Sequence, residues 1–211
     1  MREVLLSILI AVVSYLLGCI STGLMVSGAS GVDIRNAGSK NTGASNVLRV
    51  LGLRSGMITF LGDFAKATLS CWLGSLLLPG STFGIAGYGT MLGGLCVVIG
   101  HNWPVFYGFK GGKGVACSVA VIFFINPLLG IISIVICIGV IALTRYISLG
   151  SMTMLFLYMI LMCATHWGEW FTCLFTLALF SMCLWRHRTN IGRLKNGTEN
   201  KIGRKTAPSG K

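Results

Sequence analysis

Charged residues are scarce in this chain. They make up 10% of its 211 residues, whereas 54% of the residues are hydrophobic, and the mean hydropathy is +0.81. An ordinary soluble domain of this length does not have such a composition. The sequence therefore predicts an integral membrane protein whose apolar segments cross the bilayer.

Acidic residues are the rarest of all, with five Asp and Glu against 17 Lys and Arg and a net charge of +12. An excess of positive charge is also found in nucleic-acid-binding proteins. Here the basic residues lie in the connections between apolar segments, as the positive-inside rule describes for membrane proteins. We therefore interpret the charge as a signal of topology and expect no nucleic-acid partner.

The spacing Cys-x-x-Cys is absent, although the chain has eight cysteines. Six of them lie within apolar runs: Cys19, Cys71, Cys96, Cys137, Cys163 and Cys173. They are typical of small buried hydrophobic residues rather than of a disulfide framework or a metal site. Because no cluster of His, Asp and Glu is evident either, we expect neither a metal nor a cofactor.

Apolar runs of about 20 residues are long enough to cross a bilayer. Seven spans are predicted, at residues 4–26, 57–78, 83–99, 115–125, 128–143, 149–164 and 170–185. The fourth and fifth come from one apolar run that Asn126-Pro127 interrupts, since the residue before a proline is pushed away from helix. A six-span chain, with that run as one tilted helix, and a five-span chain with a re-entrant late pair are the alternatives.

The basic residues orient these spans. They follow the first, third, fifth and seventh spans, at Arg35, Lys40, Arg49, Arg54, Lys110, Lys113, Arg145 and eight later positions. The turns near Pro79, Asn126 and His166 contain neither Lys nor Arg. We therefore expect an all-α polytopic membrane protein with its N-terminus outside and its C-terminus in the cytoplasm. Residues 1–211 form a single membrane-embedded domain that ends in a basic cytoplasmic tail, 187–211.

A first polar segment, residues 38–46, is rich in glycine, hydroxyl and amide side chains. Glycine lets the backbone approach an anion closely, and the polar side chains supply hydrogen bonds. The candidate binding residues in and after this segment are Ser39, Asn41, Asn46 and Arg49. The alternative is a solvated loop that caps the following helix.

A second segment, residues 108–116, surrounds Lys113 with the glycines Gly111, Gly112 and Gly114. It is not a nucleotide-binding Walker A loop, because Gly114 stands where Ser or Thr is required. A glycine turn at the start of a hydrophobic helix is nevertheless a favourable site for phosphate. The alternative is a basic anchor at the membrane interface.

A third segment ends the last predicted span and contains His187, Asn190 and Arg193. If this segment is helical, His187 and Asn190 share a face. The alternative is a stop-transfer cluster of basic residues attracted to anionic lipids. Within the second predicted span, Asp63 and Lys66 form an i,i+3 pair that is either functional or a structural bridge.

These segments together resemble the bacterial acyl-phosphate:glycerol-3-phosphate acyltransferases, the PlsY family. The resemblance extends over nearly the whole chain and is carried by the motifs Gly38-Ser39-x-Asn41-x-Gly43-Ala44-x-Asn46-x-x-Arg49, Gly100-His101-Asn102-x-Pro104, Gly111-Gly112-Lys113-Gly114-Val115-Ala116, and His187-Arg188-x-Asn190-Ile191-x-Arg193-Leu194 with Gly197-Thr198-Glu199. Lys40 and Cys117 depart from the family pattern, in which glycine and threonine are frequent at these positions.

The resemblance implies transfer of a fatty acyl group from acyl phosphate to the 1-hydroxyl group of glycerol 3-phosphate in the bacterial inner membrane, at its cytoplasmic face. It implies that Ser39, Arg49, Lys113, His187 and Asn190 are catalytic. A larger set then binds substrate or phosphate: Asn41, Asn46, Gly111, Gly112, Gly114, Ser148 and Arg193. The expected partners are the two substrates, membrane lipid and the enzyme that produces acyl phosphate.

A membrane transporter for small anions or sugar phosphates is the alternative function. It would also use glycine breaks and cationic side chains, but it should have ionisable groups near the midplane and internal repeats. The polar residues of this chain are instead expected at one face of the membrane. The hydroxyl proton is accepted either by His187 or by a phosphate group of a substrate.

Overall fold

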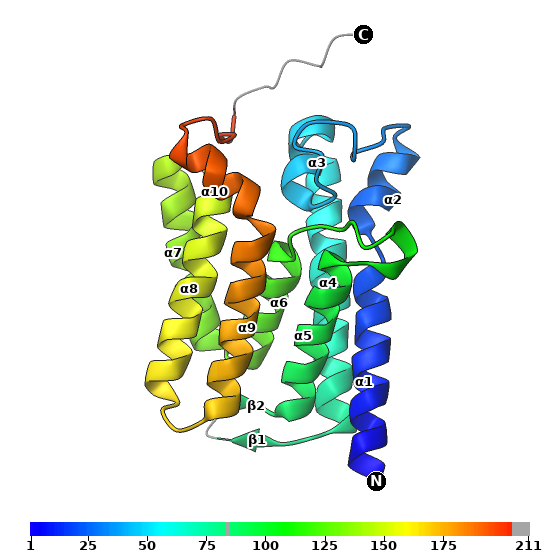
Figure 1. The fold of residues 1–211 in the computed structure, drawn as a ribbon, viewed down its shortest axis with the longest axis vertical. Coiled ribbons are helices and arrows are strands. Elements are labelled where there is room, and N and C mark those ends of the chain that lie inside the picture. The colour runs from blue at the N-terminus through cyan, green and yellow to red at the C-terminus, as the bar shows by residue number, and fades with distance from the viewer. Residues whose placement is uncertain (83–84, 204–211) are drawn as a thin grey trace.

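Long helices that run side by side make up most of the structure, a computed structural model that describes residues 1–82 and 85–203 (Figure 1). The helices are α1 (Arg2–Cys19), α2 (Thr22–Ala29), α3 (Ala44–Leu51), α4 (Leu53–Leu77), α5 (Tyr88–Asn102), α6 (Val115–Ile125), α7 (Pro127–Thr144), α8 (Ile147–Thr165), α9 (Trp170–Arg186) and α10 (Arg188–Lys195). A 3₁₀ turn, η1 (Val105–Tyr107), and two short strands, β1 (Ser81–Thr82) and β2 (Ile85–Ala86), complete the described chain.

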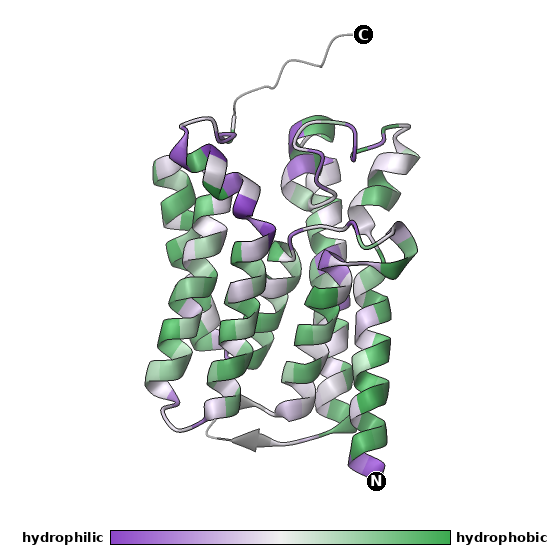
Figure 2. Ribbon diagram, in the orientation of Figure 1, coloured by the Kyte–Doolittle hydropathy of each residue, from purple (hydrophilic) through white to green (hydrophobic). Residues whose placement is uncertain are grey.

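The helices have the composition of membrane-spanning segments. Within the described residues, three helical stretches are long and apolar enough to cross a bilayer: Arg2–Ala29, Pro127–Thr144 and Ile147–Thr165. Figure 2 shows hydrophobic residues along the long helices and hydrophilic residues gathered at the end that holds α3 and α10. The prediction of a helical integral membrane protein is therefore confirmed, apart from one two-stranded hairpin.

That hairpin occupies part of the predicted third span. Ser81 pairs with Ala86 and Thr82 with Ile85 in antiparallel register, and α5 begins only at Tyr88. The expected helix start at residue 83 is therefore wrong, because short strand pairing takes up the backbone groups after the turn at Pro79. Residues 83–84 themselves lie outside the described residues, as do residues 204–211 of the predicted tail.

The first predicted span is broken. Helix α1 ends at Cys19, Ile20 is extended with ψ 109°, and α2 starts at Thr22 after the cap Ser21, whose Oγ accepts from the Leu24 N–H. Hydropathy does not show this break, because the apolar run is continuous. The local signal was a Ser-Thr pair, which favours a helix N-terminus over a helix interior.

The break predicted at Asn126-Pro127 is confirmed. Helix α6 ends at Ile125 and α7 begins at Pro127. Asn126 accepts a hydrogen bond from the Leu129 N–H at 3.1 Å, and proline suits the first helical position because no partner is needed for an N–H there.

Small residues let α1 and α5 approach each other closely. A Cβ atom on Gly18 would lie 2.3 Å from the Val97 carbonyl oxygen, and one on Gly100 would lie 2.1 Å from the Tyr15 oxygen. Such contacts are common between membrane helices, where van der Waals packing replaces the hydrophobic effect. They fix the last turn of α5, which carries His101, against the break between α1 and α2.

Candidate functional site

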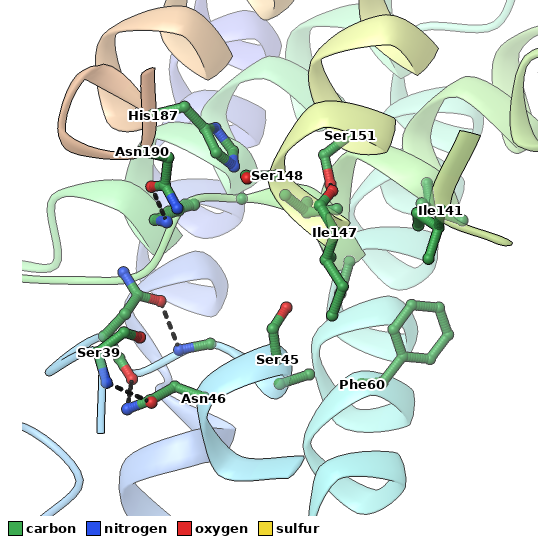
Figure 3. Close-up of a pocket in the computed structure, with 18 of the residues that line it drawn as sticks. Ser39, Ser45, Asn46, Phe60, Ile141, Ile147, Ser148, Ser151, His187 and Asn190 are labelled. Carbon is green, nitrogen blue, oxygen red and sulfur yellow. Dashed lines mark hydrogen bonds between the residues drawn. The ribbon is translucent and has the colours of Figure 1, made fainter. Parts of the chain in front are cut away.

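A cavity of about 310 Å³ opens at the polar end of the bundle and brings together the three segments singled out in the sequence (Figure 3). Its walls come from helices α3 to α8 and α10, from the connections before α3 and α6, from His187 between α9 and α10, and from the segment after α10. Ten of the twelve predicted site residues line it, all but Gly111 and Gly112: Ser39, Asn41, Asn46, Arg49, Lys113, Gly114, Ser148, His187, Asn190 and Arg193.

The cavity has a polar end and an apolar end. Figure 3 shows Ser39, His187 and Asn190 on one side of the cavity, and Phe60 and Ile141 on the other. The apolar part is lined by side chains of α4, α6, α7 and α8, including Phe60, Val119, Ile134, Ile138, Ile141 and Met154. One cavity thus offers cations and hydrogen-bonding groups next to a hydrocarbon surface.

Asn46 organises the connection before α3. It is 1% exposed, and its Oδ1 accepts from the Ser39 N–H at 2.8 Å. Its amide nitrogen donates to the oxygens of Ala37 and Asn41 at 3.0 and 2.9 Å, while Asn41 Oδ1 accepts from the Gly43 N–H. Both residues, predicted as substrate contacts, therefore also hold this loop in shape. Ser39 in the loop and Ser45 and Arg49 in α3 line the cavity beside them.

The glycine loop before α6 is held by hydrogen bonds from both sides. The Gly112 N–H donates to the His101 oxygen at 3.0 Å. Arg186 donates through Nε to the Gly112 oxygen at 2.8 Å and through Nη2 to the Gly111 oxygen at 2.7 Å. The Gly112 N–H, expected to bind phosphate, is thus already engaged, and these two glycines shape the loop behind Lys113.

Arg186 was absent from the predicted site. Its guanidinium group also lies over the Trp103 ring, 5.6 Å from the ring centroid. In the sequence it belongs to a basic run at the end of a span, which is typical of a stop-transfer signal. Only the fold, which places the end of α9 beside the loop before α6, shows that it holds two loop carbonyls.

Lys113 reaches across the cavity to α10, where its ammonium group donates to Asn190 Oδ1. Burial lowers the pKa of Lys113 to about 8; Glu199 opposes this shift, and Arg193 and Arg186 add to it. The side chain is therefore a cation at neutral pH, in a place where water stabilises its charge poorly. A phosphate group would be a favourable counter-ion.

Glu199 connects three of the predicted residues. Its Oε1 accepts from Ser148 Oγ at 2.9 Å and from Asn190 Nδ2 at 2.6 Å, and its Oε2 accepts from Arg193 Nε at 2.7 Å. Burial raises the pKa of Glu199, but these hydrogen bonds outweigh burial and hold the pKa below its ordinary value. Glu199 is in one of the family motifs but was not predicted in the site, because its distance in sequence from Ser148 conceals the contact.

His187 lies at the junction of α9 and α10 and is 2% exposed. Its Nδ1 lies 2.9 Å from the Cys183 carbonyl oxygen, which can only accept a hydrogen bond. Nδ1 therefore carries the proton and donates, and Nε2 is left as an acceptor. Burial, with a contribution from Lys113, lowers the pKa of His187 to about 4. The helix that was expected to carry His187 and Asn190 on one face is interrupted at His187, yet both side chains line the cavity.

A cluster of ionisable residues, contrary to expectation, lies at the wall of the cavity, which Asp63 and His101 line. Ligand-type atoms of Asp63, His101 and Cys117 all lie within 4.8 Å of one another. The ammonium group of Lys66 is 2.8 Å from Asp63 Oδ1, so a cation already lies next to the carboxylate.

Comparison with known proteins indicates the same family as the sequence motifs. A sequence profile of the family described as glycerol-3-phosphate acyltransferase matches residues 8–197. The chain belongs to the glycerol-3-phosphate acyltransferase family. Among curated members, it is 43% identical over 201 residues to the enzyme of Thermoanaerobacter sp. (strain X514), covering 95% of this chain and 98% of that one. It is 42% identical over 208 residues to the enzyme of Clostridioides difficile, covering 96% and 98%.

Two crystal structures of PlsY, an integral membrane member of the glycerol-3-phosphate acyltransferases, are also similar. The form with glycerol 3-phosphate superposes with a TM-score of 0.85 at 34% identity, over 93% of this chain and 96% of that chain. The form with lysophosphatidic acid gives a TM-score of 0.82 at 33% identity, over 93% and 95%. At this identity and coverage, the fold is that of an integral membrane glycerol-3-phosphate acyltransferase.

Proposed function

We propose that this protein transfers a fatty acyl group from acyl phosphate to the 1-hydroxyl group of sn-glycerol 3-phosphate, giving lysophosphatidic acid and inorganic phosphate. The observation that carries the proposal is the single cavity in which Arg49, Lys113 and Arg193 lie beside an apolar wall. A phosphorylated headgroup fits the polar end, and an acyl chain fits the apolar end. The ligands named for the two PlsY structures, glycerol 3-phosphate and lysophosphatidic acid, have the same chemistry.

Catalysis requires positioning more than covalent chemistry. Acyl phosphate is an activated mixed anhydride, so the hydroxyl oxygen attacks the acyl carbon directly and the phosphate leaves. Two phosphate groups close together repel each other, and the three cations of the cavity offset that repulsion. The cavity thus lowers the barrier by holding the reactants together and stabilising charge.

The hydroxyl proton goes to a phosphate oxygen of a substrate in this proposal. With a pKa of about 4, His187 is a weaker base than a phosphate monoester, whose second pKa is near 6. His187 Nε2 then orients the hydroxyl group as a hydrogen-bond acceptor. Turnover by His187→Gln should fall only a few fold, because glutamine retains an acceptor; a loss of more than about 1,000-fold in kcat at unchanged KM would identify His187 as the base.

The topology proposed for this reaction has seven spans in the bacterial inner membrane, an outside N-terminus and a cytoplasmic active site. In support, α3, α10 and the cavity lie at the end opposite the N-terminus (Figure 1). Impermeant thiol reagents should label Trp167→Cys, in a turn where the tryptophan is 90% exposed, on intact cells. They should label Lys195→Cys only after permeabilisation, with the native cysteines that react replaced in both proteins. The reverse pattern would contradict the orientation.

Transfer of labelled glycerol 3-phosphate into lipid by the purified protein is the decisive experiment. Palmitoyl phosphate and palmitoyl-CoA serve as alternative donors, and Lys113→Ala serves as the inactive variant. Product from acyl phosphate alone, lost in the variant, is expected. No product from either donor, with folded protein, would refute the proposal and make transport of a small anion the next function to test.

A further inference from the structure

The ammonium group of Lys66 lies inside the bundle among oxygen and nitrogen acceptors. Its Nζ donates to the backbone oxygens of Ile20 and Gly18 at 2.6 and 3.0 Å. It also lies 2.8 Å from Asp63 Oδ1 and 3.2 Å from His101 Nδ1. Lys66, Asp63 and His101 are 7%, 1% and 6% exposed. We refer to these three residues as the buried charge cluster.

The cluster lies at the break in the first membrane helix. Carbonyl groups at the end of a helix lack intrahelical partners, and those of Gly18 and Ile20 find theirs in Lys66. From the other side of the break, Thr22 Oγ1 donates to Asp63 Oδ1 at 3.3 Å. Carbonyl and carboxylate oxygens around an unwound helix are the usual ligands of a monovalent cation in membrane proteins. Here the cation is the side chain of Lys66.

A bound divalent metal is a poorer explanation of this cluster. Asp63, His101 and Cys117 offer three ligand atoms within 4.8 Å of one another, but the Lys66 ammonium is 2.8 Å from the carboxylate. A divalent ion there would face that positive charge in an interior of low dielectric constant. Lys66 itself neutralises Asp63, so the cluster requires no other cation.

The buried charge cluster also contacts the glycine loop and the start of α6, on both sides of Lys113. Before Lys113, Gly112 donates its N–H to the His101 oxygen at 3.0 Å, and a Cβ atom on Gly112 would lie 2.0 Å from His101 Nε2. After Lys113, Cys117 Sγ donates to the Asp63 backbone oxygen at 3.3 Å. Asp63 and His101 line the cavity. The position of Lys113 therefore depends on the cluster, although no substrate atom needs to contact Lys66.

Given the acyltransferase function proposed above, on which this inference rests, we propose that Lys66 is a positioning residue. Its ammonium group acts as a tethered cation that joins the break in the first membrane helix to Asp63 and His101. The joined cluster sets the position of the glycine loop and of Lys113 at the phosphate end of the cavity. This function explains why a charged pair lies in a membrane helix, where an unpaired charge is costly.

The test is chemical rescue of Lys66→Ala. We expect kcat/KM for glycerol 3-phosphate to fall about 100-fold, because misplacement of a catalytic group by about 1 Å has that effect. Methylammonium chloride should raise the kcat/KM of Lys66→Ala at least about tenfold, because the small cation fills the space left by the Lys66 ammonium group. Tetramethylammonium chloride at equal ionic strength should not. Lys66→Met, which fills the space with an apolar side chain, should not respond. Lys195→Ala, at an exposed position of α10, should behave as wild type.

Each outcome decides one question. Lys66→Ala within threefold of wild type, or an inactive and folded Lys66→Ala that methylammonium leaves unchanged, would overturn the tethered-cation role. An inactive wild-type protein would instead refute the acyltransferase function, and this inference with it.

If Lys66→Ala does not fold, the double variant Asp63→Asn/Lys66→Met, which removes both charges of the Asp63–Lys66 pair, takes its place. A loss of about 100-fold in kcat/KM at an unchanged melting temperature would support the inference. Activity within threefold of wild type, or failure of the double variant to fold, would show that the cluster has only a structural role.

Discussion

Arg186 offers a direct test of whether the glycine loop must be held in place for activity. Its two hydrogen bonds, to the Gly112 and Gly111 oxygens, are 2.8 and 2.7 Å long. Hydrogen bonds that involve a charged group contribute about 1.5–3 kcal/mol each. Because Arg186 is half-buried, we take the lower value for both, about 3 kcal/mol in total. If this free energy holds the active loop position, Arg186→Met should lower kcat/KM by about 100-fold, at about 1.4 kcal/mol per factor of ten.

Arg186→Lys separates geometry from charge. A lysine keeps the positive charge but is not a planar fork with two parallel donors, so it should retain about one of the two bonds and lose about tenfold in kcat/KM. The assay is transfer of labelled glycerol 3-phosphate to palmitoyl phosphate, with a melting temperature for each variant. Arg188, which is exposed and donates to the Trp185 oxygen, gives the matched control Arg188→Met. Folded Arg186→Met within threefold of wild type would refute the reasoning, and a fully active Arg186→Lys would reduce the role of Arg186 to its charge.

Two further predictions concern the same loop. Gly112→Ala should lower kcat/KM by about 10- to 100-fold, because its Cβ would lie 2.0 Å from His101 Nε2 and relief of such a clash costs about 1–3 kcal/mol. The control Gly192→Ala, with no neighbouring atom within 4 Å, should keep full activity. Equal kinetics of the two variants would contradict the packing argument. Burial lowers the pKa of Lys113 to about 8, so its ammonium group is present below that pH and is lost as the pH rises through it. Wild-type kcat/KM should therefore decline above about pH 8. A profile that stays flat between about pH 7 and 10 would show that the charge of Lys113 is not required.

The sequence predicted the composition of the site better than its internal geometry. The short polar segments, read together with the family motifs that they carry, identified ten cavity-lining residues. Charge and backbone freedom, which marked those segments, are local properties of the sequence. Arg186 and Glu199 were missed as site residues because their roles depend on partners 74 and 51 residues away in the sequence. Asn41 and Asn46 both line the cavity, and the sequence did not show that their side-chain amides also make hydrogen bonds within their own loop.

The fold shows the same contrast between local signals, which the sequence reveals, and contacts between distant residues, which it does not. Proline and asparagine marked the break between α6 and α7 correctly, since their effects on the backbone are local. The break between α1 and α2 was missed, because it lies within an unbroken apolar run and is stabilised by Lys66 from another helix. Hydropathy reports the solvent around a helix, whereas the continuity of the helix also depends on tertiary contacts.

The short length of α6 has a consequence for the energetics of the acyl donor. Its 11 residues rise about 16 Å, roughly half of a hydrocarbon core of about 30 Å, and the loop that enters it lies deeper in the bundle than α3 or α10 (Figure 1). Raising an acyl chain into water would cost about 0.8 kcal/mol for each exposed CH₂ group, or about 4 kcal/mol for five of them. In the proposed reaction a recessed Lys113 would remove this cost, because the water-soluble reactant descends to the level of the lipid and the lipid does not have to leave its leaflet.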